Sequence, residues 1–185
     1  MTWLDAVPLV LIPVYLVLSL STGGVIRRGI GFVGAYLACF AATNMGLQTA
    51  GILTTSYPNM PTPDARIYGF FGILAAVIIL VEGAVLILGK QLEFTAVALN
   101  RFLGLAVGLI TGVAVAVVVT VEFTGAASPE GNAQLDQLQI SVRQIVHDSK
   151  VAAPLSKAVG KYVEVLFKPV LPVNPGAYFG PGPVV

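Results

Sequence analysis

Residues 102–123, FLGLAVGLITGVAVAVVVTVEF, decide the fold class, because this stretch carries a single charged residue, Glu122. A hydrocarbon core roughly 30 Å thick needs about 20 apolar residues in an α-helix to cross it. Three further stretches meet this requirement, at about 3–20, 29–51 and 67–89. Lipid offers no hydrogen-bond partner for a free backbone amide, so each stretch must be helical. The sequence therefore predicts an all-α integral membrane protein built as a four-transmembrane-helix bundle.

The composition of the rest of the chain agrees with a membrane protein. Of the 185 residues 56% are hydrophobic and 10% are charged, with a mean hydropathy of +0.88, whereas soluble domains carry about 25% charged residues. A net charge of +1 gives no reason to expect nucleic-acid binding. Cys39 is the only cysteine and His147 the only histidine, and no phosphate-binding loop or nucleophile motif occurs. We therefore expect no enzyme activity, no cofactor and no metal site.

Basic residues that flank the spans predict the orientation in the membrane. Cytoplasmic loops carry an excess of Lys and Arg. The loops after the first and third spans share one side, and the opposite side offers only Arg66 near the membrane. The basic residues of the first side are Arg27, Arg28, Lys90 and Arg101. This difference places the first and third loops in the cytoplasm and both termini outside it.

The chain divides into a four-helix transmembrane domain, residues 1–124, and an extracytoplasmic tail, residues 125–185. Apolar residues at helical spacing predict a first tail helix, and a second is expected from about 155 to 167. The apolar stripe of the first tail helix consists of Leu135, Leu138, Val142 and Ile145. The final stretch, 174–181, is rich in Pro and Gly and predicts an extended tail that could bind a partner.

The second tail helix is predicted to be amphipathic and basic. Its apolar side is expected to hold Leu155, Val159, Tyr162, Val163 and Leu166, and its charged side Lys157, Lys161, Glu164 and Lys168. Such a helix can lie on anionic lipid, which is the plainer interpretation. It can also dock on the bundle or on another protein. The candidate contacts to a partner or to lipid are Leu155, Lys157, Lys161 and Lys168.

Three polar residues inside the spans are candidate functional groups. Glu82 lies within the third span, where a charge costs about 2.5–3.5 kcal/mol. It could be a protonatable site or cation ligand on a transport path, but an ion pair with a nearby arginine is the favoured interpretation. Asn44 and Gln48 lie four residues apart on one face of the second span. Their favoured use is hydrogen bonding between helices.

Small residues mark the faces on which the helices pack. Gly104, Gly108 and Gly112 form two overlapping G-x-x-x-G steps on the fourth span. This spacing lets two helix backbones approach closely in lipid. A related stripe of small residues begins at Gly34 in the second span. Packing within the bundle is the favoured interpretation, and a dimerisation face is the alternative.

Two motifs resemble the colicin V production protein (CvpA) family. One is an acidic residue that opens the first span, followed by a G-x-x-R turn. The other, at the entry to the fourth span, is similar to the family's D-R-x-x-G-x-x-x-G-x-x-x-G signature. The matching residues are Asp5, Gly24, Arg27, Gly29, Asn100, Arg101, Gly104, Gly108 and Gly112. Asn100 replaces the family's usual aspartate, so an Asp–Arg ion pair is not available there. Ser149 to Leu155 resembles the family's S-x-x-x-x-P-L tail.

This resemblance implies a multi-pass protein of the bacterial inner membrane, linked to toxin (colicin V) production or export and to envelope homeostasis. It implies no known reaction. Our leading hypothesis is a non-catalytic scaffold or accessory protein that contacts the bilayer and a membrane or envelope protein partner. The alternative is a small transporter or channel subunit that uses Glu82 and the Asn44/Gln48 patch. That alternative calls for a homo-oligomer, because four helices alone line a pore poorly.

Overall fold

The computed structural model describes residues 2–22, 24–88, 97–128 and 137–180. Within these ranges all regular structure is helical. Four helices are long and apolar enough to cross a membrane, so the protein is membrane-embedded and the predicted number of spans is confirmed. Lys90 and Leu135, which entered the predictions of orientation and of the first tail helix, lie outside the described residues.

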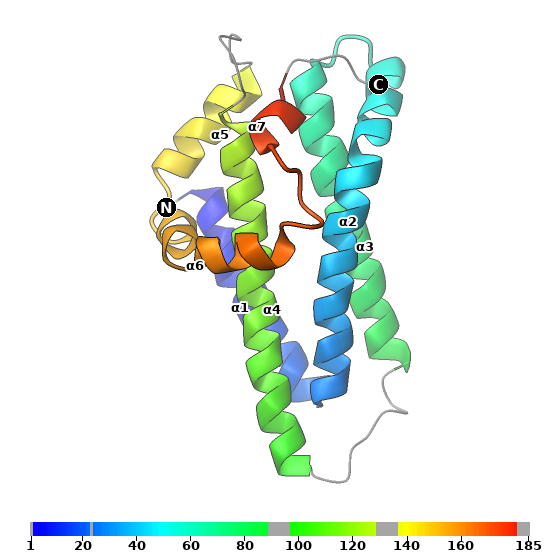
Figure 1. The fold of residues 1–185 in the computed structure, drawn as a ribbon, viewed down its shortest axis with the longest axis vertical. Coiled ribbons are helices and arrows are strands. Elements are labelled where there is room, and N and C mark those ends of the chain that lie inside the picture. Colours follow the sequence, from blue (N-terminus) through cyan, green and yellow to red (C-terminus); the bar gives the residue numbers. More distant parts are fainter. Residues whose placement is uncertain (1, 23, 89–96, 129–136, 181–185) are drawn as a thin grey trace.

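The four long helices are α1 (Trp3–Thr22), α2 (Val25–Ser56), α3 (Thr62–Leu88) and α4 (Val97–Ala126) (Figure 1). Helix α2 has 32 residues and exceeds its predicted span, 29–51, at both ends. At 1.5 Å per residue it is about 48 Å long. Since the hydrocarbon core is only about 30 Å thick, α2 must tilt within the membrane or extend beyond it.

Small residues bring the long helices together in two pairs, α1 with α4 and α2 with α3. A methyl group added to Gly112 would lie 3.2 Å from the Cα of Ile12, and one added to Gly108 would collide with the side chain of Ser19. On the other pair, a methyl group on Gly34 would collide with Val81 of α3. The glycine stripes therefore serve contacts within the bundle.

The C-terminal segment forms three shorter helices, α5 (Gln137–His147), α6 (Ala152–Phe167) and α7 (Pro175–Tyr178). Helix α6 runs across the bundle, with contacts to α4 and α1 (Figure 1). It shares one hydrophobic core with the long helices, since Phe167 is fully buried and its ring lies 6.0 Å from that of Phe32 and 5.5 Å from that of Tyr36. The transmembrane and tail segments are thus packed as one unit in the described residues.

Residues 174–180, the described part of the Pro- and Gly-rich stretch, do not form the extended tail that this composition predicted. Asn174 accepts a hydrogen bond from the Ala177 amide through its side chain (3.2 Å) and so opens the short helix α7. Phe179 is fully buried, with its ring 5.5 Å from that of Phe70 and 6.3 Å from that of Phe71 in α3. Burial of this aromatic side chain offsets the low helix propensity of the segment.

Two glycines in α3 allow a matched test of the close packing. A methyl group on Gly69 would lie 2.5 Å from the carbonyl oxygen of Gly46 in α2, whereas one on Gly72 would meet no atom within 4 Å. Gly69→Ala is therefore expected to lower the free energy of unfolding by about 1–3 kcal/mol, because backbone must move. Gly72→Ala should leave it unchanged or raise it slightly.

The free energies of unfolding of both variants are measured in mixed micelles with an increasing fraction of denaturing detergent. Equal stability of the two variants would contradict the described contact between α2 and α3.

Candidate functional site

The carboxylate of Asp5 accepts hydrogen bonds from the N-terminus of α6. Its Oδ1 accepts hydrogen bonds from the Ser149 hydroxyl (2.6 Å) and from the backbone amides of Lys150 (3.0 Å), Val151 (2.9 Å) and Ala152 (3.2 Å). Asp5 is fully buried. Amides at a helix N-terminus have no partner within the helix and favour negative charge. Asp5, near the start of α1, thus caps a helix more than 140 positions away in the chain.

No local side chain does the same work for α6 at its capping position. The N-cap residue, Val151, cannot accept a hydrogen bond through its side chain. Ser149 contributes a second contact, since its hydroxyl oxygen accepts a hydrogen bond from the Ala153 amide (3.0 Å). Two parts of the CvpA-like pattern, the acid that opens the first span and the serine of the tail, therefore meet at one point.

Asn100 caps a second helix in the same remote manner. Its Oδ1 accepts a hydrogen bond from the amide of Val25, the first residue of α2 (2.8 Å). Gly24, the N-cap residue, has a φ of +128°, which favours glycine, and a methyl group on Gly104 would lie 3.1 Å from its carbonyl carbon. Asparagine and aspartate are nearly equivalent as helix caps. The asparagine at position 100 is thus compatible with the contact that it makes.

The remaining motif residues fall into different environments. Arg27 is buried and Arg101 is exposed. Gly29 has open space around it, since an added methyl group would meet no atom within 4 Å. Packing therefore does not require a glycine at position 29, whereas it does at position 104.

A separate set of hydrogen bonds holds the end of the chain. The guanidinium of Arg66 donates from Nη1 to the carbonyl oxygens of Gly180 (2.8 Å) and Tyr178 (3.1 Å). The Tyr178 hydroxyl donates to the carbonyl oxygens of Ala42 (3.1 Å) and Thr43 (3.2 Å) in α2. Burial raises the pKa of Tyr178 to about 12, so this hydroxyl keeps the proton that it donates.

Gln139 links α5 to both α4 and the chain end. It is almost fully buried, and its Nε2 donates to the carbonyl oxygens of Ala126 (3.2 Å) and Phe179 (3.4 Å). Gln139 was not predicted as a functional residue, because a glutamine in a polar helix is usually solvent-exposed. Its position three residues before the buried Val142 was the available signal, since residues at that spacing share a helix face.

Helix α6 buries a different face from the predicted one. Val163 is buried, and Leu155 and Val159 pack against the core in part, as expected. Tyr162 and Leu166, which were assigned to the same apolar side, are instead 75% and 48% exposed. The buried residues of α6 recur at helical spacing on one face, and Tyr162 and Leu166 fall outside that face; the buried residues are Ala152, Gly160, Val163 and Phe167. The helix therefore turns its smallest residue inward.

The outward side of α6 combines apolar and basic residues. Tyr162, Val165 and Leu166 are exposed together on it. Of the predicted partner or lipid contacts, Lys157, Lys161 and Lys168 are exposed and Leu155 is half-buried. We call Tyr162, Val165 and Leu166 the α6 outer patch.

Glu82 pairs with an arginine inside the bundle. Its Oε2 lies 3.4 Å from Nη1 of Arg28, whose side chain is only 1% exposed. A methyl group on Gly31 would lie 2.8 Å from Glu82 Oε1, so the small residue makes room for the carboxylate. The arrangement neutralises the charge of Glu82 where water is scarce.

Asn44 and Gln48 do not lie inside the bundle. Both side chains are exposed on the outer side of α2. The amide Nδ2 of Asn44 donates to the carbonyl oxygen of Phe40 in its own helix (2.7 Å), in place of the expected bond between helices. These two amides are thus separate from the Arg28–Glu82 pair.

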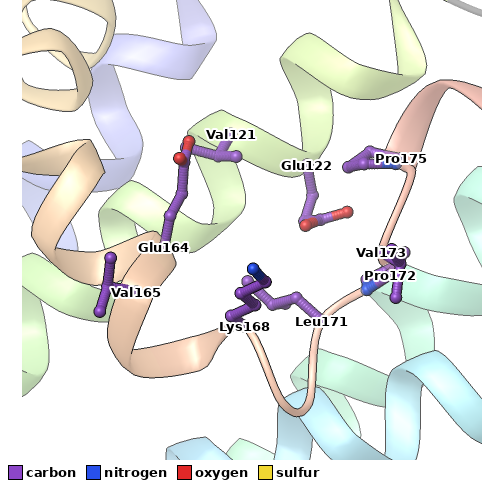
Figure 2. Close-up of a pocket in the computed structure, with 9 residues that line it drawn as sticks. All are labelled: Val121, Glu122, Glu164, Val165, Lys168, Leu171, Pro172, Val173 and Pro175. Atoms are coloured by element: carbon purple, nitrogen blue, oxygen red, sulfur yellow. The ribbon is translucent and has the colours of Figure 1, made fainter.

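A cavity lies between α4, α6 and the segment that leads to α7 (Figure 2). Glu122 of α4 points into it, together with Glu164 of α6 and Lys168, which follows the last residue of α6. Within the described ranges no group of three or more His, Cys, Asp or Glu residues could hold a metal ion. The charged side chains of Glu122, Glu164 and Lys168 can instead form ion pairs or hydrogen bonds with a ligand.

Comparisons with family models, with curated proteins and with solved structures gave no match for this chain. The resemblance to the CvpA family thus rests on the motif residues themselves. Of these, the structure gives Asp5 and Asn100 defined contacts, and it places Gly104, Gly108 and Gly112 along the contact of α4 with α1 and the turn before α2.

Asp5→Asn is expected to loosen α6, because it removes the charge that the helix N-terminus faces. Tryptic cleavage at Lys157 and Lys161 requires local opening of the helix. We expect cleavage to accelerate by roughly tenfold, since charge-assisted hydrogen bonds are the strong ones. Asp148→Asn, at an exposed position next to Ser149, is the control and should cleave at the original rate. Equal rates for both variants would contradict the capping role of Asp5.

Glu82→Gln is expected to destabilise the protein by about 3–5 kcal/mol, because it removes the negative charge that Glu82 places beside the buried Arg28. In a double-mutant cycle, Arg28→Gln with Glu82→Gln should cost less than the sum of the single substitutions. The free energies of unfolding in mixed micelles give this coupling. Additive effects would show that the pair contributes nothing to stability.

Proposed function

We propose that the chain is a CvpA-like scaffold or accessory protein of the bacterial inner membrane, linked to toxin production or export and to envelope homeostasis. The observation that carries the proposal is the fixed position of α6. Asp5 holds its N-terminus through Ser149 and three amides, and the outer patch stays exposed with Tyr162 at 75% and Val165 at 70%. A half-apolar surface that is held in place in this way is suited to binding.

The membrane bundle, residues 1–124, serves in this proposal as the base for the amphipathic tail, residues 125–185. Four basic residues flank the first and third loops against one on the opposite side, which supports a cytoplasmic location for those loops. Asp5 and α6 then lie toward the extracytoplasmic side, where both termini are placed. A partner would meet the tail there.

The residues on the outer side of α6 indicate which kind of protein surface could bind there. Its apolar patch is flanked by the exposed lysines Lys157 and Lys161. An apolar groove with acidic residues at its rim would complement this surface. The surrounding lipid head groups contact the same helix in part, since lysines reach readily toward anionic lipid.

The transport alternative has less support from the geometry. Glu82 is paired with Arg28, and Asn44 and Gln48 lie on the outside of α2. These residues therefore form no common polar path in the described part of the chain.

The proposal predicts that the outer patch retains a partner. The full chain is purified from native membranes in mild detergent, beside a Tyr162→Ser, Val165→Ser double variant. Loss of two central apolar contacts should lower recovery of a stoichiometric partner by about tenfold or more. Tyr68→Ser, which changes an exposed tyrosine of α3, is the matched control and should retain the partner. Unchanged recovery with the double variant, or no partner with any form, would contradict the proposal.

A further inference from the structure

The cavity under α6 has the size and shape of a small-ligand site. Its volume is about 410 Å³, within the range of about 300–1,000 Å³ that ligand pockets occupy. Val173 at its edge is 95% exposed, so the cavity is open on that side. Its walls are mostly apolar and comprise Val121, Val165, Leu171, Pro172, Val173 and Pro175. Glu122, Glu164 and Lys168 supply the charges (Figure 2).

One carboxylate oxygen of Glu122, Oε2, lacks a hydrogen-bond donor. Its side chain is 1% exposed, and its Oε2 forms no hydrogen bond in the described structure. Burial of an unsatisfied acceptor is costly. Lys168 lies near Glu122 and Glu164 in Figure 2 but forms no ion pair with either of them among the described residues. A ligand that brings an N–H donor would satisfy Glu122.

The cavity also lies at the depth of lipid head groups. Phe123, next to Glu122 in the chain, packs edge-to-face with Trp3 at a centroid distance of 5.1 Å. Trp3 is half-exposed at the beginning of the first span. Tryptophans with this placement are typical of the membrane–water interface. Glu122 is therefore at the level where head groups are concentrated.

We propose that this cavity binds a phosphoethanolamine group, with the ammonium on Glu122 and the phosphate toward Lys168. A primary ammonium supplies the hydrogen-bond donors that Glu122 Oε2 lacks, and a quaternary ammonium has none to supply. Glu164 lies on the α6 side of the cavity and adds a second negative charge. The apolar walls suit the carbon atoms that adjoin the head group. Val165 belongs to both the cavity wall and the α6 outer patch, whereas Glu122 and Lys168 lie outside that patch, so variants of these two residues test the cavity separately from a protein partner.

The group can come from phosphatidylethanolamine or from a soluble phosphoethanolamine, and both carry the same chemistry. The purified full chain, stripped of lipid in detergent, is titrated with phosphatidylethanolamine or phosphatidylcholine of the same acyl chains, and with soluble phosphoethanolamine. Binding is measured by the shift of the thermal unfolding midpoint. We expect about tenfold tighter binding of phosphatidylethanolamine than of phosphatidylcholine. A shift with soluble phosphoethanolamine of similar affinity would assign the site to the soluble form.

Variants test the assignment of each charge. Glu122→Gln keeps the side-chain shape and should remove the preference for phosphoethanolamine over phosphocholine, and Lys168→Gln should weaken binding severalfold. Lys157→Gln changes an exposed lysine of α6 that does not line the cavity, and should bind like the original chain.

Equal binding of the two lipids by the original chain, with no response to soluble phosphoethanolamine, would overturn the proposal. Retention of the preference in Glu122→Gln would do the same. If that variant does not fold, unchanged binding by the exposed-site variant Lys168→Gln overturns the assignment.

Discussion

The carboxylate of Asp5, at the start of the first membrane span, holds the N-terminus of α6 through one hydroxyl and three backbone amides. A buried carboxylate without partners would be costly, and so would a buried helix N-terminus without acceptors. Each group satisfies the other. The contact fixes where α6 begins, and the burial of Phe167 fixes where it ends. The position of the outer patch and the shape of the cavity under α6 both depend on this placement.

The same physical device occurs at the other end of α1. There Asn100 of α4 caps α2, whose N-cap residue is a glycine without a side chain. Two helices thus receive their caps from distant segments, and each cap joins elements that are far apart in the sequence. In a membrane protein, where lipid cannot satisfy a free amide, such contacts restrict the arrangements open to the helices. They account for the polar residues Asp5 and Asn100 near the ends of membrane-spanning helices.

The number and approximate positions of the membrane-spanning helices could be predicted from the sequence, because the thickness of the bilayer sets how long and how apolar each span must be. Glu82 was expected to pair with an arginine, and the structure pairs it with Arg28. The predicted buried face of α6 was wrong in part: hydrophobicity placed Tyr162 inward, whereas the face that packs on the bundle holds Gly160, Val163 and Phe167. The buried Phe179 was missed because Pro and Gly content indicates local flexibility and carries no information on long-range packing.

Candidate functional residues were harder to predict for the same reason. Glu122 is the single charged residue of the stretch 102–123, and only the return of α6 over α4 encloses it. Gln139 likewise acquires its role from two carbonyl groups in other helices. Contacts between separate helices depend on how the chain packs, which one sequence does not display.

The central claim is that α6 is fixed to the membrane bundle at its N-terminus, and hydrogen exchange of the unmodified chain in a lipid bilayer tests it most directly. The amides of Lys150, Val151 and Ala152, which donate to Asp5, should exchange as slowly as those in the middle of α4. Exchange of these three amides at the rate of an unstructured peptide would contradict the account.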